Sequence, residues 1–207
     1  MPRPRMHDPD TVLDAAEALA TRSGPAAVTI RAVAAATGVS NGAIYHTFAS
    51  RAELLARTWI RAAERFISLQ ADLVQGHTGD EAVIAAAEAP ADFAHRFPLS
   101  TKMFFTVRRE DLLDDEDLSD PVREALDVPQ RALIALMKRL ARELWGRADG
   151  AAVDVLTICL VDLPTAILIE RDRFAAPLAR EQLRAAVRAV LAVGPPPQKP
   201  QPAKDNR

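Results

Sequence analysis

The chain has 207 residues, which is enough to bury a core in one large or two small domains without disulfide or metal staples. The composition, 49% hydrophobic and 26% charged, excludes a disordered chain, and the single cysteine, Cys159, excludes a disulfide framework or a multi-cysteine zinc site. Lys and Arg number 26 against 28 Asp and Glu, so a nucleic-acid interaction must be indicated by local sequence rather than by net charge.

Helical periodicity runs through the first third of the chain. It predicts helices over 10–22, 29–36, 40–47 and 50–75. Thr29, Ser40 and Ser50 are suitable N-caps, and Glu53 stands three residues after Ser50, as in a capping box. Gly38 separates the second helix from the third.

The rest of the chain is also helical, with no convincing strand, so we predict an all-α fold of about nine helices. Further helices are expected over 80–96, from 98, from 129, over 149–171 and over 177–193. Pro90 predicts a kink or a split in its helix. Residues 110–120 include seven acids and predict a loop with a short turn, without the pattern of a calcium loop. Five prolines in 195–207 predict a disordered tail.

No targeting or membrane segment is expected. The N-terminal residues lack the apolar core of a signal peptide. The most apolar stretch, Val153 to Ile169, contains Asp154, Asp162 and Pro164, and its uncharged run is shorter than the roughly 18 residues of a bilayer span. We therefore expect a cytoplasmic protein.

Residues 29–51 have the pattern of two short helices around a tight turn. Ile44 and Phe48 would pack the second helix inward, which leaves a small, polar face without acids. A helix that enters the major groove of DNA needs such a face. Arg31 and Arg51 flank it and could contact phosphates. The residues on this face are Ser40, Asn41, Gly42, Ala43, Tyr45, His46 and Thr47.

The segment TIRAVAAATGVSNGAIYHTFASRAELL, preceded by DTVLDAAEALATRSG, resembles the DNA-binding domain of the TetR/AcrR family of bacterial transcription regulators over about residues 8–56. The resemblance implies a homodimer that binds a near-palindromic operator in double-stranded DNA and is released by a small molecule. Thr47 stands where many members have an aromatic residue or His, and Arg51 where Lys is usual. The operator-facing positions that match are Arg31, Ser40, Asn41, Gly42, Ala43, Tyr45, His46, Thr47 and Arg51.

The same resemblance implies a helix-turn-helix domain over 1–56, a ligand-binding and dimerisation domain over 57–194, and the tail after it. Its last two helices would form the dimer interface. The penultimate helix is apolar nearly all round, which requires a second cover, and Leu160 and Leu183 fall on the expected seam. Candidate ligand contacts, each also explicable as plain core, are Trp59, Phe66, Phe93, Phe97, Met103, Phe104, Met137, Cys159 and Asp162. Asp162 could instead line the dimer seam.

Three functions fit these observations. The first is a repressor released by a ligand. The second is a ligand-independent regulator or an activator. The third is an enzyme that uses the helical chamber, but the four histidines have no metal-ligand spacing, and no phosphate loop or nucleophile elbow is present. We therefore expect no catalytic residue, no metal and no cofactor.

Overall fold

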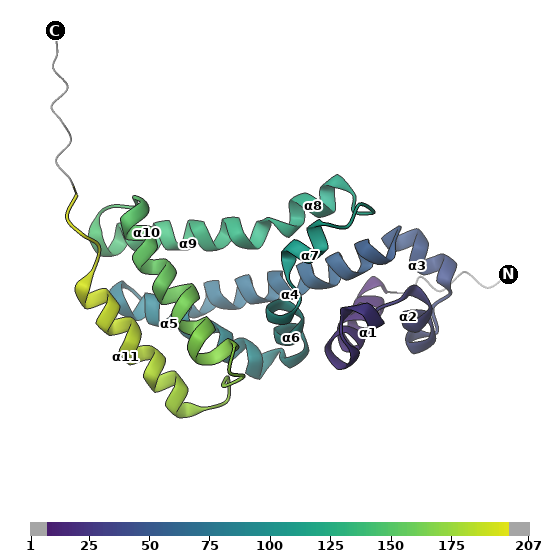
Figure 1. The fold of residues 1–207 in the computed structure, drawn as a ribbon, viewed down its shortest axis with the longest axis horizontal. Helices are drawn as coiled ribbons and strands as arrows, with labels where there is room; N and C mark the ends of the chain where they lie inside the picture. Colours follow the sequence, from purple (N-terminus) through teal and green to yellow (C-terminus); the bar gives the residue numbers. More distant parts are fainter. Residues whose placement is uncertain (1–7, 199–207) are drawn as a thin grey trace, which may run out of the picture.

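The computed structural model describes residues 8–198, and all regular elements in this range are helical. Helices α1 (Pro9–Ser23), α2 (Ile30–Thr37) and α3 (Asn41–Phe48) form a small unit at one end of an elongated molecule (Figure 1). Helix α4 (Arg51–Val74) leaves this unit and runs along the larger helical body. The all-α prediction is confirmed. Most of the predicted tail, 199–207, lies outside the described residues.

The predicted caps of the small unit are confirmed. The Thr29 hydroxyl accepts a hydrogen bond from the backbone N–H of Ala32 at 3.1 Å, which begins α2. The Ser50 hydroxyl accepts from the N–H of Glu53 at 3.0 Å and begins α4. Each cap satisfies one of the backbone donors left free at a helix start, so the sequence itself fixes where these helices begin.

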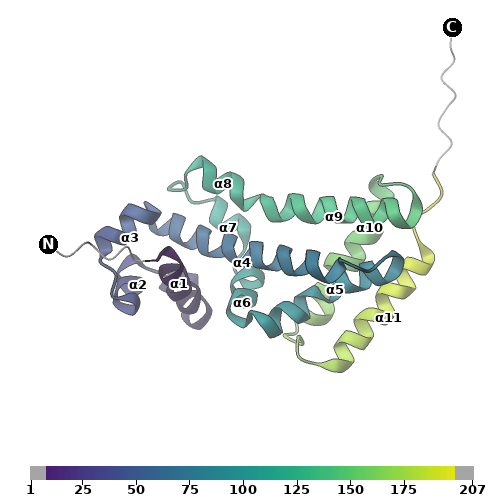
Figure 2. The same cartoon turned by 180° about the vertical axis from the view of Figure 1, so that it is seen from behind.

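The larger body packs helices against both sides of α4. Helices α5 (Gly79–Arg96) and α6 (Pro98–Thr106) turn back along it, and α9 (Val128–Trp145) lies beside it in both views (Figures 1 and 2). Helices α10 (Gly150–Thr157) and α11 (Pro177–Val193) close the end far from the small unit.

The prediction that residues 110–120 form a loop with a short turn is wrong in part. Its beginning lies in a short helix, α7 (Arg109–Leu113), and its end starts another, α8 (Asp120–Leu126), which was not predicted from the sequence. Leucines stand among the acids of this stretch, and Leu112 on α7 and Leu126 on α8 are buried against the core around α4. Burial of these side chains stabilises two short helices that their local composition does not favour.

Helix α5 continues through Pro90 rather than splitting there. A proline has no N–H, so the carbonyl four residues earlier, that of Ala86, loses its helical partner. The side chain of Gln70 on α4, which is buried, donates a hydrogen bond from Nε2 to this carbonyl at 3.0 Å. A neighbouring helix thus replaces the missing bond, and α5 remains one element.

Gln70→Leu is expected to destabilise the fold by about 1–3 kcal/mol, because it leaves the Ala86 carbonyl buried without a donor. Pro90→Ala restores a helical N–H for that carbonyl, so it should recover most of the loss in the Gln70→Leu background. Urea unfolding of the two single variants and the double variant measures this coupling. Additive effects would show that Gln70 does not compensate for Pro90.

The penultimate helix continues beyond α10 in two π-helical turns, η2 (Ile158–Asp162) and η3 (Thr165–Ile169), on either side of Pro164. A proline removes one helical hydrogen bond and crowds the preceding turn, so a wider turn on each side accommodates it.

Among the described residues, the helical run Gly150–Ile169 is long and apolar enough to cross a membrane by length and composition alone. The expectation that this stretch is too short for a bilayer span does not hold, because two acids, Asp154 and Asp162, do not make the run too polar for one. Only 33% of its most apolar window is buried within the chain. An apolar face therefore remains uncovered in one protomer.

Two clusters of buried residues hold the molecule together. One joins α1, α2 and α3 to the first half of α4 and continues into α6 and α8. The other lies among α5, α9, the penultimate helix and α11. Leu160 and Leu183 belong to this second cluster and are 7% and 0% exposed, so they are core residues of the protomer rather than exposed seam residues.

Candidate nucleic-acid interface and ligand chamber

Helix α3 is held by a tight turn and two buried side chains. Gly38 ends α2 with φ +74°, the left-handed conformation that glycine adopts without steric penalty. The Ser40 hydroxyl then accepts from the N–H of Ala43 at 3.2 Å and caps α3. Ile44 and Phe48 are 1% and 2% exposed, which fixes the rotation of α3 about its axis.

That rotation turns the predicted DNA-facing side chains to solvent. Tyr45 is 53% exposed, and Asn41, Gly42 and His46 are exposed beside it. Helix α3 itself carries no acid. The exposed side of α3 therefore has the shape and charge required for major-groove entry.

The flanking residues differ in their surroundings. Arg31 is exposed at the start of α2. Arg51 instead turns inward, where its Nε donates to the Val28 carbonyl at 2.6 Å and its guanidinium also donates to the Pro25 carbonyl at 2.7 Å. Arg51 thus ties the segment between α1 and α2 to the start of α4, a role that its position in the sequence did not indicate.

The remaining members of the predicted set have local roles. Thr47 is exposed, and its hydroxyl donates to the Ala43 carbonyl at 3.1 Å within α3. Ala43 is half-buried, and Ser40 serves as the cap. Contact of these residues with DNA stays a prediction.

Tyr45→Ala is expected to weaken binding to all duplexes by a similar factor of about 3–10, because a phosphate contact carries no sequence information. Asn41→Ala should instead change the preference among operator variants, because an Asn side chain can pair with the edge of adenine. Anisotropy titrations on a set of single-base operator variants measure both. Equal losses on every duplex from Asn41→Ala would exclude base reading by this residue.

A cavity of about 460 Å³ lies between α4, α6 and α9. Its floor is a cluster of aromatic rings: Phe104 lies 5.3 Å from Trp59 and 5.1 Å from Phe66 between centroids, and Phe105 lies 5.5 Å from Phe66. Its volume and apolar walls are those of small-molecule sites. We call this cavity the chamber; it is lined by Trp59, Phe66, Ile67, Gln70, Ala71, Phe104, Phe105, Val107, Arg108, Arg109, Pro129, Gln130, Ala132, Leu133, Leu136 and Arg139.

Three of the predicted ligand contacts, Trp59, Phe66 and Phe104, line the chamber. The others lie elsewhere. Phe97 packs against Phe93 with 5.6 Å between ring centroids, and Asp162 is exposed on η2. The predicted contacts that are buried in the protein interior are Phe93, Met103, Met137 and Cys159.

The thiol of Cys159 is fully buried, and burial raises its pKa to about 12. The thiol therefore stays protonated at neutral pH, which is the inert form of a cysteine. The described residues contain no cluster of three or more His, Cys, Asp or Glu that could hold a metal ion.

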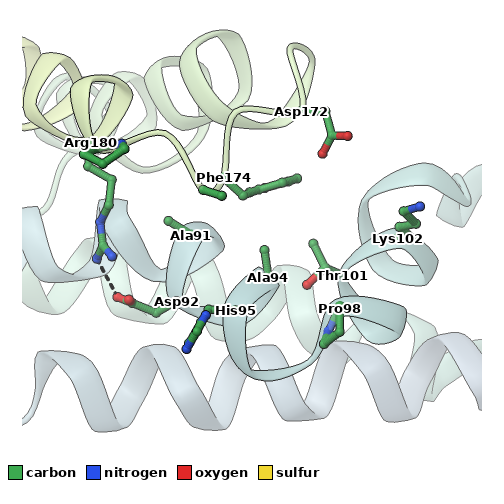
Figure 3. A pocket seen from close by; sticks show the side chains of 12 residues that line it. Ala91, Asp92, Ala94, His95, Pro98, Thr101, Lys102, Asp172, Phe174 and Arg180 are labelled. Atoms are coloured by element: carbon green, nitrogen blue, oxygen red, sulfur yellow. Dashed lines mark hydrogen bonds and ion pairs between the residues drawn. The ribbon is translucent and has the colours of Figure 1, made fainter.

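A second, larger pocket of about 910 Å³ lies where α5, α6 and the start of α11 meet (Figure 3). Small and charged residues line it, and both signs of charge are present: Asp92 and Asp172 against Lys102 and Arg180. Arg180 already pairs with Asp92 at 2.9 Å. This pocket shares no lining residue with the chamber, but its Phe174 stacks on Phe105 of the chamber with 6.2 Å between ring centroids.

The walls of the chamber are joined directly to the small unit. Indole Nε1 of Trp59 donates to the carbonyl of Val107 at 3.1 Å, which fixes the end of α6 against α4. At the other end of α6, the hydroxyl of Thr21 on α1 donates to the Leu99 carbonyl at 3.4 Å. Helix α6 therefore contacts the chamber and α1 at once.

A buried ion network adds to this junction. Glu17 on α1 is 3% exposed and accepts from Arg61 at 3.0 Å and from Arg65 at 3.3 Å, both on α4. Arg65 also donates to the hydroxyl of Ser100 on α6 at 3.0 Å. Breaking one partner of such a network is costly, so the position of α1 is coupled to that of α4 and α6.

The predicted capping box at α4 is incomplete. The carboxylate of Glu53 does not return to Ser50 but accepts from the N–H of Ser119 at 3.3 Å, just before α8. The Ser50 hydroxyl also donates to the Asp117 carbonyl at 3.4 Å. These residues connect the start of α4 to the segment that the sequence predicted as a solvent-exposed loop.

Comparison with known proteins agrees with this arrangement. Residues 12–58 match the family model described as bacterial regulatory proteins, tetR family. No curated protein matches the sequence.

Solved structures extend the likeness to the whole chain. A transcriptional regulator from Pseudomonas aeruginosa PAO1 has a TM-score of 0.70 at 20% identity over 89% of this chain and 88% of its own. PfmR, a TetR family regulator from Thermus thermophilus, has a TM-score of 0.64 at 21% identity over 87% of this chain and 97% of its own. The ketosteroid regulator KstR2 of Mycobacterium tuberculosis has a TM-score of 0.62 at 17% identity over 95% of this chain and 98% of its own.

The fold and the exposed recognition helix define a helix-turn-helix transcriptional regulator that binds DNA. Residues 12–58 match the model of the tetR family, and the helices that follow share their fold with solved structures of transcriptional regulators, PfmR of the TetR family among them.

Proposed function

We propose that the protein is a repressor that binds a near-palindromic operator as a homodimer and releases it when a small molecule occupies the chamber. The observation that carries this proposal is the position of Trp59, which lines the chamber and also donates a hydrogen bond to the Val107 carbonyl at the end of α6. One side chain therefore lines the ligand site and also holds α4 to α6, the helix that contacts α1 through the Leu99 carbonyl.

Release of the operator follows from this link between the chamber and α6. A ligand that packs against Phe104 and Phe105 favours an arrangement in which α6 has moved relative to α4. Because the Leu99 carbonyl of α6 accepts from Thr21, such a movement is passed to α1. In a dimer, recognition helices must lie one DNA turn apart, about 34–36 Å, so a change in their separation weakens operator binding.

In the DNA complex, α3 lies in the major groove. Tyr45 contacts phosphate, whereas Asn41 and His46 reach base edges. Arg31 supports binding from the start of α2. The functional division falls inside α4, with the DNA-binding unit over 1–56, the ligand-binding and dimerisation unit over 57–194, and a tail from 195. The protein acts in the cytoplasm, where operator DNA lies.

The dimer seam lies on the exposed side of the penultimate helix and α11. Ile158 is 39% exposed and Leu178 is 59% exposed on these helices. Pairing two such faces forms a four-helix bundle and covers the apolar surface that one protomer leaves open.

Ala132→Trp tests release because Ala132 lines the chamber from α9, away from the contacts with α1. The larger side chain fills the cavity, so operator affinity should stay within about threefold while release is lost. Anisotropy of a labelled operator is followed during titration with naphthaleneacetate, naphthaleneethanol and naphthaleneethylamine. Release of both the parent and the variant by the same compound would place the effector outside the chamber.

A further inference from the structure

The polar groups of the chamber carry charge of one sign. Among its lining residues there are three arginines, Arg108, Arg109 and Arg139, and no aspartate or glutamate. Gln70 and Gln130 are the uncharged polar members, and the Gln70 amide already donates to the Ala86 carbonyl. A ligand in the chamber thus meets an aromatic floor and a cationic rim.

The three arginines are not equally available. Arg109 is neutralised by Asp127, whose carboxylate lies 2.6 Å from the guanidinium, and Glu110 lies 3.7 Å away. Arg108 approaches Glu110 only at 4.0 Å, and both side chains are largely exposed, so water screens this pair. Arg139 forms no ion pair within residues 8–198.

Arg139 lies close to the apolar wall. It follows Leu136 by three residues on α9, so both side chains share the side of the helix that faces the chamber. Arg108 also lines the chamber, two residues after the end of α6, the helix that carries Phe104 and Phe105. Two available guanidinium groups therefore flank the apolar floor from different elements.

Resting on the proposed function, we propose that the effector is an amphipathic anion: an apolar body that packs on the Trp59–Phe66–Phe104 cluster, with one anionic head group held by Arg139 and Arg108. Charge-assisted hydrogen bonds from guanidinium to such an oxyanion are stronger than neutral ones. A cationic ligand of the same shape meets two positive charges and no acid in the lining. The larger pocket differs here, since its lining includes the carboxylate of Asp172, which forms no ion pair within residues 8–198 and could receive a cation.

Direct binding of three matched probes tests this proposal. Naphthaleneacetate, naphthaleneethanol and naphthaleneethylamine share one ring system and carry a negative, neutral and positive head group. Isothermal titration calorimetry on the full chain without DNA should show the anion binding about tenfold more tightly than the alcohol, with the amine weakest.

Arginine variants locate the head group. Arg139→Gln, and Arg108→Gln with it, should reduce the affinity for naphthaleneacetate to that for naphthaleneethanol and leave the alcohol unchanged. Arg142→Gln is the matched control, because Arg142 is exposed on the same helix and does not line the chamber. It removes the same charge, and it should leave all three affinities unchanged.

The outcomes separate the two proposals. Equal affinity for the three probes, a preference for the amine, or an anion affinity unaffected by the Arg139 and Arg108 substitutions would overturn the anion proposal and leave the chamber as a ligand site. Binding of none of the probes would overturn both the chamber and the anion proposal. Operator binding without ligand is measured separately and does not depend on either result.

Discussion

Gly42→Glu is expected to reduce operator affinity at least about 100-fold while leaving the protein folded. Gly42 is the second residue of α3 and is exposed, and a Cβ added there meets no atom within 4 Å. Glutamate near a helix start gains about 1 kcal/mol of helix propensity over glycine and interacts favourably with the helix dipole. The thermal unfolding midpoint should therefore not fall.

The loss of binding has an electrostatic cause. The new carboxylate would stand on the side of α3 that approaches the phosphate backbone, and like charges repel strongly there. Gly42→Gln is the matched control, because it adds nearly the same bulk without the charge. Anisotropy titrations should show a smaller loss for Gly42→Gln. Operator affinity of Gly42→Glu equal to that of the parent would show that this side of α3 does not face DNA.

Ile158→Asp is expected to produce monomers and, with them, a loss of operator affinity of about 100-fold or more. Ile158 is 39% exposed on the penultimate helix, and only 33% of the most apolar window of that helix is buried within the chain. A carboxylate placed inside a dimer seam would lose its water without gaining a partner. The second effect follows because one recognition helix alone loses the benefit of binding two half-sites together.

Ile134→Asp is the control for this experiment. Ile134 is 37% exposed on α9 and does not belong to the proposed seam. The two variants therefore introduce the same side chain at similarly exposed positions and differ only in location. Sedimentation velocity should show dimers for Ile134→Asp and monomers for Ile158→Asp. Dimers of Ile158→Asp would place the interface on another surface. Asp at Leu160 or Leu183 would be uninformative, since both are buried and their loss would unfold the protomer.

The small unit could be predicted closely because its structure is encoded locally. Thr29, Ser40 and Ser50 bond to backbone groups three residues away, and Gly38 takes a left-handed turn that few other residues tolerate. The exposed side of α3 follows from the spacing of Ile44 and Phe48. Such signals need no knowledge of distant parts of the chain.

The features that could not be predicted depend on distant partners. Gln70 keeps α5 continuous by bonding a carbonyl 16 residues away, and Glu53 meets the backbone of Ser119, 66 residues away. Burial of Leu112 and Leu126 stabilises two short helices in and after a stretch whose charges indicate a loop. Local periodicity contains no information about these contacts.

The lining of the chamber also could not be predicted fully from local sequence. Aromatic and methionine side chains at helical spacing identified Trp59, Phe66 and Phe104, but the same signal selected Phe93 and Met103, which are core. Arg108 and Arg139 gave no signal, because 31 residues separate them and they meet only when α9 packs along α4. Whether a side chain faces a cavity or the core depends on the rotation of each packed helix.

Operator selection tests the central claim, that this protein is a sequence-selective dimeric regulator, most directly. A random-sequence duplex pool is enriched with the full chain, and the recovered sequence is compared with a scrambled duplex by anisotropy at two salt concentrations. We predict a near-palindromic sequence with half-sites about one helical turn apart, bound by two or four chains and preferred about 1,000-fold or more. Equal, weak and strongly salt-dependent binding to both duplexes would contradict it.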